Sequence, residues 1–440
     1  MISSTAQPGI YLRSLTAPQW YNDSCAETRP KWIYNDGHFS RNAYYPVTII
    51  GGGYVGLSSL LHLVSTKKIP THFGDGKPFA VLLEEKQIGS GPSGNSGGHI
   101  CWLQANKKQM IRSCGKNLAG RLSEHMRGAT DLIDKIVNKY HIDCGFTRCY
   151  AELTRSGWNI SAENRLGWLG PYPFLLGIAS AAQATGRAEI HERTFVQQVE
   201  QVGRLCRITT DRGVFWTSYV IAAGGHRMAE TIHLFRKQRS QTVEIYVSSM
   251  LASGISQDVF GQGLPSNLRE LAQKYGRFPF VHEHHDNMIY GMVDYQNGSI
   301  MFGSRDTVDG NKAEIELMQQ DLFSLFPKLR ALFSRHNVTS RLLVEAMPIS
   351  IPINLMPIVA LTGNVISIQG LGGHGLAIGV LLGKAAAKKV LSLSRDDVGG
   401  SKAFDDFKAV QHIKIPPIQY RYIRRVAAYT GKKLHAYGVI

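Results

Sequence analysis

A short apolar run that ends in a glycine cluster constrains this chain more than any other feature. Residues 47–50 (VTII) predict a buried strand, and Gly51, Gly53 and Gly56 follow it with the spacing G-x-G-x-x-G. The first glycine permits a tight turn, the second lets the backbone approach a phosphate, and the third lets the next helix pack closely. We expect that helix to begin at Tyr54 and to direct its free N–H groups at the pyrophosphate of a dinucleotide.

A second strand candidate supplies the acid that such a site needs. Residues 80–83 (AVLL) are followed by Glu84 and Glu85, where the ribose hydroxyls of an adenosine should lie. A carboxylate accepts hydrogen bonds from a free ribose diol and repels a 2′-phosphate, which disfavours NADP. Glu84 lies further along the chain from the glycine cluster than the usual spacing of about 20 residues. We interpret the polar, Gly- and Pro-containing loop at residues 66–79 as a surface insertion that causes this delay.

From the second strand onward the sequence resembles a known family. Residues 85–99 (EKQIGSGPSGNSGGH) are similar to the glycine-rich segment of FAD-dependent oxidoreductases of the D-amino-acid oxidase superfamily, above all its γ-glutamylputrescine oxidoreductase branch. Asn95, Ser96 and His99 stand where that branch carries Arg, Asn and Gln. The resemblance covers nearly the whole chain from Tyr11. Its other main segments are residues 142–153, 219–225, 298–306, 368–384 and 404–425.

The resemblance implies an α/β fold with two main parts. The first is a Rossmann-like FAD-binding domain assembled from discontinuous segments, residues 45–105, 170–233 and 342–400. The second is an α+β substrate domain with an antiparallel sheet, formed by residues 106–169 and 234–341. Residues 1–44 are expected to wrap the outside, and residues 401–440 to form a C-terminal extension. Alternating polar and apolar residues over 286–306 predict a hairpin with its turn at residues 296–298.

The cofactor that the resemblance implies is non-covalently bound FAD. A second glycine cluster at residues 370–375 precedes a helix expected to begin near Leu376. In the family this helix start lies against the flavin ring, where it would stabilise negative charge on the reduced ring by roughly 0.3 to 2 kcal/mol. The alternative is that these glycines only cap and pack the helix. The expected FAD contacts are Gly51, Gly53, Tyr54, Val55, Gly56, Glu84, Glu85, Ser93, Gly94, Gly97, Gly98, Val196, Ala223, Gly224, Gly370, Gly372, Gly373, His374 and Gly375.

The implied reaction is oxidation of the C–N bond of an amine or amino acid by hydride transfer to flavin N5, followed by reoxidation by oxygen or another acceptor. Three side chains are candidates for the catalytic site. Arg305 can clamp a carboxylate or pair with a nearby acid, His374 can bond to the flavin or cap its helix, and His99 can approach the ring or lie on the surface. The branch's substrate is not carried over, because residues 345–348 (EAMP) depart from its segment beside the flavin.

The net charge of +16, from 49 Lys and Arg against 33 Asp and Glu, does not follow from this fold. The basic residues are scattered in pairs, which favours a solvated basic surface over a specific polyanion site. Two alternatives stay open: a flavin-dependent RNA-modifying or nucleic-acid-binding protein, and a flavin-binding protein without turnover.

The remaining features predict a protein without a metal or a membrane segment. No stretch reaches the ~18 apolar residues of a membrane span, and no signal-peptide core is visible, so we expect a cytoplasmic location. The histidines at residues 282–285 are not expected to bind a metal, because neighbours on a strand face opposite ways. The six cysteines show no C-x-x-C pair and are expected to be reduced, structural thiols.

Overall fold

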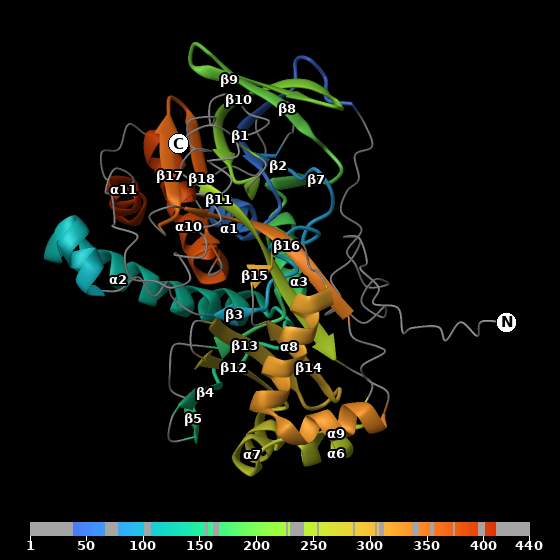
Figure 1. Cartoon of the computed structure of the whole chain (residues 1–440). Helices are drawn as coiled ribbons and strands as arrows, with labels where there is room; N and C mark the ends of the chain where they lie inside the picture. The colour runs from blue at the N-terminus through green and yellow to red at the C-terminus, as the bar shows by residue number, and fades with distance from the viewer. Residues whose placement is uncertain are drawn as a thin grey trace.

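The first of the two eight-stranded sheets gathers strands from three distant parts of the chain (Figure 1). Its main path runs β17-β18-β10-β1-β2-β7. These strands are β1 (Tyr44–Ile50), β2 (Ala80–Leu83), β7 (Ala188–His191), β10 (Gly213–Ala222), β17 (Ile358–Thr362) and β18 (Val365–Gln369). All neighbours on this path pair in parallel except β17 and β18. The strands β8 (Val196–Val202) and β9 (Leu205–Thr210) extend the sheet from β10 in antiparallel pairs.

The computed structural model describes most of the chain between residues 38 and 410. The described ranges are 38–66, 78–100, 107–154, 157–161, 167–225, 228, 242–252, 255–284, 287–303, 306–307, 312–336, 343–352, 356–372, 375–394 and 401–410.

Together with the short helix α11 (Lys402–Ala409), four helices build the core on one side of this sheet. They are α1 (Tyr54–Val64), α2 (Lys107–Tyr140), α3 (Pro171–Gln183) and α10 (Gly375–Leu393). Helix α1 is buried almost all round, and Ser58 Oγ on it donates a hydrogen bond to the Val380 carbonyl of α10 at 2.6 Å. The two helices lie so close that a Cβ on Gly383 would be 2.5 Å from the Val55 carbonyl oxygen. Close packing of α1 and α10 therefore fixes the positions of these two helices, and of their first turns, relative to each other.

The second sheet forms the other lobe, below the first in Figure 1. Its path runs β15-β11-β14-β13-β12-β4-β5, and β16 pairs with β11. These strands are β4 (Tyr150–Thr154), β5 (Gly157–Ser161), β11 (Thr242–Ala252), β12 (Arg277–His284), β13 (Asn287–Asp294), β14 (Ser299–Gly303), β15 (Asp306–Thr307) and β16 (Leu343–Pro352). The pairs are antiparallel except β12 with β4. Its helices are α6 (Gln257–Gly263), α7 (Ser266–Tyr275), α8 (Lys312–Leu325) and α9 (Pro327–Arg335), which share one hydrophobic core with the sheet.

The structure confirms the expected fold class and the expected hairpin. Strands β13 and β14 pair antiparallel, and Gly298 in their turn has a φ of +53°, which glycine adopts readily. Two elements lie elsewhere than their predicted segments suggest. Helix α2 packs into the core of the first lobe through residues such as Leu122 and Ile133, and β16 pairs along its length with β11 in the second sheet. The domain boundaries stay a prediction, and residues 1–37 and 411–440 lie outside the described residues.

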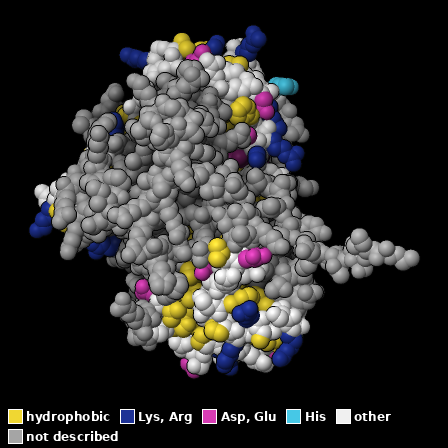
Figure 2. Space-filling view, viewed as in Figure 1, with side chains coloured by type: hydrophobic (Ala, Val, Ile, Leu, Met, Phe, Trp, Pro, Cys, Tyr) yellow, Lys and Arg dark blue, Asp and Glu magenta, His cyan; other side chains and the backbone are white. Residues whose placement is uncertain are grey.

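No helix among the described residues is long and apolar enough to cross a membrane. No group of three or more His, Cys, Asp or Glu side chains within the described ranges is placed to hold a metal. On the face shown in Figure 2, Lys and Arg side chains of described residues lie in separate groups rather than one continuous band.

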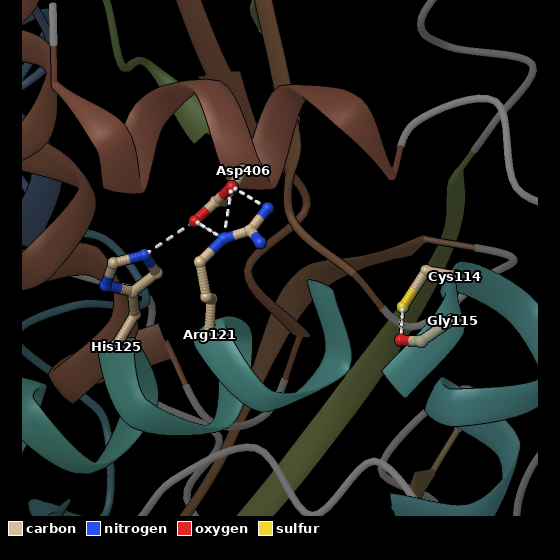
Figure 3. Close-up of polar contacts among 5 residues, drawn as sticks. All are labelled: Cys114, Gly115, Arg121, His125 and Asp406. Atoms are coloured by element: carbon tan, nitrogen blue, oxygen red, sulfur yellow. Dashed lines mark hydrogen bonds and ion pairs between the residues drawn. The ribbon is translucent and has the colours of Figure 1, made fainter. Parts of the chain in front are cut away.

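Helix α11 (Lys402–Ala409) docks on α2 through a charged cluster (Figure 3). Arg121 Nη2 donates to Asp406 Oδ1 at 2.8 Å, and His125 Nε2 lies 3.0 Å from Asp406 Oδ2. Burial by itself would raise the pKa of Asp406, but the hydrogen bonds from Arg121 and His125 outweigh it and hold the pKa below its usual range. The ionised form is therefore favoured by folding. Its contribution to stability is present above the unfolded-state pKa and is lost as the pH falls through the lower folded-state pKa.

We expect Asp406→Asn to lower the midpoint of thermal unfolding at neutral pH by roughly 2 to 4 °C, because the buried hydrogen bonds lose their charged acceptor. The difference from the wild type should shrink below about pH 4, where the unfolded carboxylate becomes protonated. Asp405→Asn is the matched control, since Asp405 is half exposed and pairs with Lys389 at 3.0 Å. Its shift should be under roughly 1 °C, and an equal shift in both variants would contradict the prediction. Thermal scans followed by circular dichroism measure both.

A candidate dinucleotide site at the carboxyl edge of the first sheet

The carboxyl ends of four parallel strands meet at the first glycine turn. Strands β1, β2, β10 and β18 end here, and β1 lies between β2 and β10. The Gly51 N–H donates to the Leu83 carbonyl at 2.8 Å, and the Ala223 N–H donates to the Ile50 carbonyl at 2.8 Å. In open parallel sheets, ligands bind beyond the carboxyl ends of the strands, where the strand order reverses. The glycine turn occupies that position.

Each of the three glycines lies where a side chain would collide with its surroundings. Gly51 has a φ of +102°, and a Cβ on it would be 2.6 Å from the Ala223 carbonyl oxygen. A Cβ on Gly56 would lie 1.8 Å from the Gly51 carbonyl oxygen, and one on Gly53 would lie 2.7 Å from Ser93 Oγ. A side chain at any of these positions would therefore displace the turn or one of its neighbours.

The start of α1 has the properties of an anion site. Gly53 is its N-cap and offers no side-chain acceptor, and the first turn contains no acidic residue. The first N–H groups of a helix have no partner within the helix, and they carry the positive end of its dipole. A pyrophosphate placed over Gly53 would satisfy these groups.

Glu84 braces the glycine turn, which the sequence did not reveal. Its Oε2 accepts a hydrogen bond from the Gly52 N–H at 2.7 Å, and its Oε1 accepts one from the Lys86 N–H at 3.0 Å. Burial raises the pKa of Glu84, the two N–H donors oppose that rise, and the carboxylates of Glu85 and Glu192 add to it. An ionised carboxylate has further lone pairs. The same side chain can therefore hold the turn and accept from a ribose hydroxyl.

Hydrogen bonds from elsewhere in the fold fix the second glycine-rich loop. Tyr54 OH and Ser96 Oγ lie 2.8 Å apart, and Trp168 Nε1 donates to the Gly97 carbonyl at 2.9 Å. Gly98 has a φ of +70°, and a Cβ on it would lie 2.1 Å from the Leu169 carbonyl oxygen. Asn95 and Ser96, which differ from the γ-glutamylputrescine oxidoreductase branch, both stabilise this loop. Ser96 forms a hydrogen bond with Tyr54, and Asn95 Nδ2 donates to backbone carbonyls of the loop.

His99 lies where the two lobes meet. It forms β3 (His99–Ile100), which pairs with β6 (Gly167–Trp168). Its ring is 5.6 Å from the Tyr290 ring at an interplanar angle of 87°, an edge-to-face contact. Met292 and Met301 of the second sheet cluster with Trp168 and Tyr290. The second sheet therefore reaches the glycine loop through Tyr290 and the methionines, none of which the sequence singled out.

The second glycine cluster follows β18 and leads into α10. Gly370 and Gly372 both have a φ of +62°, and α10 begins at Gly375, close to the expected start. A Cβ on Gly379 would lie 3.0 Å from Tyr54 Cβ, so the first turns of α10 and α1 are neighbours. Both helix starts therefore face the carboxyl edge of the sheet.

The structure brings most of the predicted cofactor residues to this edge. Four of them directly follow the last residue of a strand: Gly51, Glu84, Ala223 and Gly370. In the second glycine-rich loop, Gly94 packs on Gly89 with no room for a Cβ. Val196 is buried at the start of β8, within the core of the opposite sheet face. Arg305, Gly373 and His374 lie outside the described residues, so two of the three catalytic candidates have no structural account. The bare glycine turn, the uncapped helix start and Glu84 fit an adenine dinucleotide.

We expect Trp168→Phe to loosen this loop, because phenylalanine keeps an aromatic six-membered ring but removes the indole N–H that donates to the Gly97 carbonyl. The buried carbonyl then lacks a partner, which costs about 1 to 3 kcal/mol. The flavin affinity should fall by about tenfold, as measured by fluorescence titration of the apoprotein. Trp158→Phe is the control, since Trp158 stacks on Phe326 in the second lobe, far from the loop. Equal losses in the two variants would show that the effect is general destabilisation.

This fold and this edge define a dinucleotide-binding enzyme with a second, mixed-sheet lobe over the site. In comparison with known proteins, residues 46–156 and 151–389 match the DAO family, FAD dependent oxidoreductase. The chain belongs to this family, and it is therefore an FAD-dependent oxidoreductase. The match confirms the predicted resemblance and the predicted cofactor.

The similar proteins span nearly the same length. The chain is 22% identical over 410 residues to γ-glutamylputrescine oxidoreductase of Escherichia coli (strain K12), covering 84% of this chain and 87% of that protein. It is 22% identical over 391 residues to the probable oxidoreductase OrdL of Haemophilus influenzae, covering 78% and 82%. Glycine oxidase from Bacillus cereus has a similar structure with a TM-score of 0.57 at 15% identity, covering 79% of this chain and 95% of that one. L-proline dehydrogenase from P. horikoshii gives a TM-score of 0.57 at 13% identity, covering 84% and 98%. These structural likenesses show the fold.

Proposed function

We propose that the enzyme oxidises the C–N bond of a small amine or amino acid. The observation that carries this proposal is the junction of Tyr290 and His99, where the second sheet covers the loop leading from the dinucleotide edge. The similar proteins named for amine and amino-acid substrates support the substrate class. Non-covalent attachment of FAD is part of the proposal, because the described groups that would meet the dinucleotide are backbone N–H donors and the Glu84 carboxylate.

The chain's own residues would hold and shield the reacting partners. The N–H groups at the start of α1 would bind the pyrophosphate, and Glu84 would accept from the ribose. When bound, FAD supplies the acceptor for the hydride that leaves the substrate carbon. Tyr290, which is partly exposed and backed by the buried Met292 and Met301, would form a wall that excludes water and helps to orient the amine carbon toward the cofactor.

The proposal is tested by anaerobic titration of the FAD-loaded protein with amino acids, N-methyl amino acids and polyamine derivatives. Bleaching of the flavin absorbance by one of these classes would identify the substrate, and readmission of air would separate an oxidase from a dehydrogenase. Acid precipitation should release the flavin into the supernatant. A flavin that stays bound to the precipitate would contradict non-covalent binding, and a loaded protein that none of these compounds reduces would contradict the substrate class.

A further inference from the structure

Three helices of the first lobe converge at the end of α1 that is remote from the glycine turn. Ser59 Oγ of α1 donates to the Gly383 carbonyl of α10 at 3.1 Å. At the end of α1, Ser65 Oγ lies 2.8 Å from the hydroxyl of Tyr140, the last residue of α2. These bonds place the C-terminal end of α1 beside the middle of α10 and the C-terminal end of α2.

Four lysines gather at this convergence. Lys135 and Lys139 lie one turn apart on α2, and Lys384 and Lys388 lie one turn apart on α10. Lys384 is half-buried and the other three are exposed. Burial lowers the pKa of Lys384, and the charges of Lys388 and Lys135 lower it further. The ammonium groups of Lys388 and Lys135 are therefore near enough to repel that of Lys384.

His62 of α1 adds no positive charge to this surface at neutral pH. Burial lowers its pKa to about 4, and Lys384, Lys388 and Lys139 contribute to that lowering. Its Nδ1 lies 2.8 Å from the Ser58 carbonyl oxygen, which fixes the ring on α1. The surface is thus a patch of four lysines over a neutral histidine.

Within the described part of the chain, no carboxylate forms an ion pair with any of these four lysines. The nearby acids of α2 are engaged elsewhere, since Asp131 and Asp134 lie 3.7 and 3.0 Å from Arg148 Nη2. Like charges held together without a counter-charge raise the energy of the folded state. A surface patch of this kind attracts and orients an anionic partner.

The same pair of helices already binds carboxylates that another helix of this chain presents, beside the buried Phe404 and Phe407 of that helix. Helix α11 contributes Asp406, which binds Arg121 of α2, and Asp405, which binds Lys389 of α10. The four lysines occupy the same two helices further toward the end of α2. The α2–α10 pair thus already pairs its basic side chains with carboxylates presented by a helix.

We propose that the lysine surface, Lys135, Lys139, Lys384 and Lys388, is the docking site of a partner protein that presents an acidic helix with carboxylates one turn apart. Each lysine pair spans about 6 Å along its helix, the spacing of residues i and i+4 on a facing helix. Proteins that bind nucleic acid strongly neutralise about 6 to 10 phosphates, more than this compact patch can contact. The site is separate from the dinucleotide edge, at the opposite end of α1.

The experiment uses the full-length, FAD-loaded protein and a fluorescent alanine-based helical peptide with glutamate pairs one turn apart. We expect saturable binding at low salt that weakens as salt is added. The variant with Lys135, Lys139, Lys384 and Lys388 all changed to Gln should bind at least about tenfold more weakly. The matched control changes Lys274, Lys328, Arg330 and Arg335 to Gln. These four are exposed on α7 and α9, so the control removes the same charge from the other lobe.

Circular dichroism and flavin content establish that both variants are folded. Unchanged peptide binding by the control supports the proposal. Absence of peptide binding at low salt overturns it, and so does an equal loss in the two variants, which would indicate only the bulk charge. Tighter binding of an RNA hairpin or of phosphatidylserine vesicles than of the peptide, abolished in the lysine variant, would assign the surface to another partner and overturn it as well.

Discussion

Replacing Gly56 by alanine is expected to give a protein that no longer retains FAD. The new Cβ would lie 1.8 Å from the Gly51 carbonyl oxygen and 3.4 Å from Ile49 Cγ2, so the helix or the turn must move. Gly51 cannot move freely, because Ala223 closes its other side at 2.6 Å from an added Cβ. Displacing this turn changes the surface that would receive the pyrophosphate. We expect the Kd for FAD to rise by more than about 100-fold, as measured by fluorescence titration of the apoprotein.

Two further variants separate loss of the cofactor from loss of the fold. Gly91→Ala is the control, since Gly91 lies in the neighbouring loop and nothing is within 4 Å of its added Cβ. It should bind FAD like the wild type. The double variant Gly53→Ala/Ser93→Ala removes the Oγ atom that an added Cβ would meet at 2.7 Å. It should fold normally by circular dichroism yet bind FAD more weakly, because it changes two expected FAD contacts, the bare backbone at Gly53 and the hydroxyl of Ser93. Normal FAD affinity in both Gly56→Ala and the double variant would contradict the proposed site.

Local patterns were enough to predict the first turn of this site. The strand at residues 80–83 and the helix from Tyr54 lie where the sequence indicated, because apolar runs and glycine spacing act over a few residues. The same holds for the hairpin turn at Gly298. The sequence therefore predicts those short backbone segments whose conformation is set by their own residues.

Side-chain partners far apart in the chain could not be predicted in the same way. Trp168 binds Gly97 across 71 residues, and His99 meets Tyr290 only because two sheets come together. The apolar stripe of α2 shows that the helix packs on something, but it does not show which lobe it packs on. The hydrogen bond from the Gly52 N–H to Glu84 could not be predicted for another reason. An acid after a strand indicates a ligand for the ribose, and nothing in the sequence shows that it also binds the glycine turn.

Replacing Glu84 by glutamine is expected to weaken FAD binding by about 10- to 100-fold, which corresponds to the loss of charge-assisted hydrogen bonds. A glutamine side chain has one acceptor oxygen, so it can serve either the Gly52 N–H or the Lys86 N–H but not both in the observed arrangement. The turn loses a brace, and the ribose loses an ionised acceptor. Titration of the apoprotein with FAD measures the sum of both effects.

The pH dependence distinguishes the two roles of Glu84. Its pKa is raised in the folded protein, so the ionised form is disfavoured and the apoprotein loses stability as the pH rises from the unfolded-state pKa to the folded-state pKa. FAD affinity should change in the opposite direction, rising as Glu84 ionises and becomes a stronger acceptor. In Glu84→Gln the contribution of Glu84 to both slopes should be absent, whereas the contribution of Asp406 to stability should remain. Denaturant unfolding and FAD titration across the acidic range measure them.

Glu85→Gln is the matched control, because it removes the same charge from the adjacent residue and leaves the acceptor of the Gly52 N–H in place. The sequence offered Glu84 and Glu85 together as ribose ligands, whereas the structure directs the Glu84 carboxylate toward the turn. We therefore expect Glu85→Gln to reduce FAD affinity by less than about threefold, within the small effect of a nearby surface charge. A larger loss in Glu85→Gln than in Glu84→Gln would transfer the ribose contact to Glu85 and leave Glu84 as a brace alone.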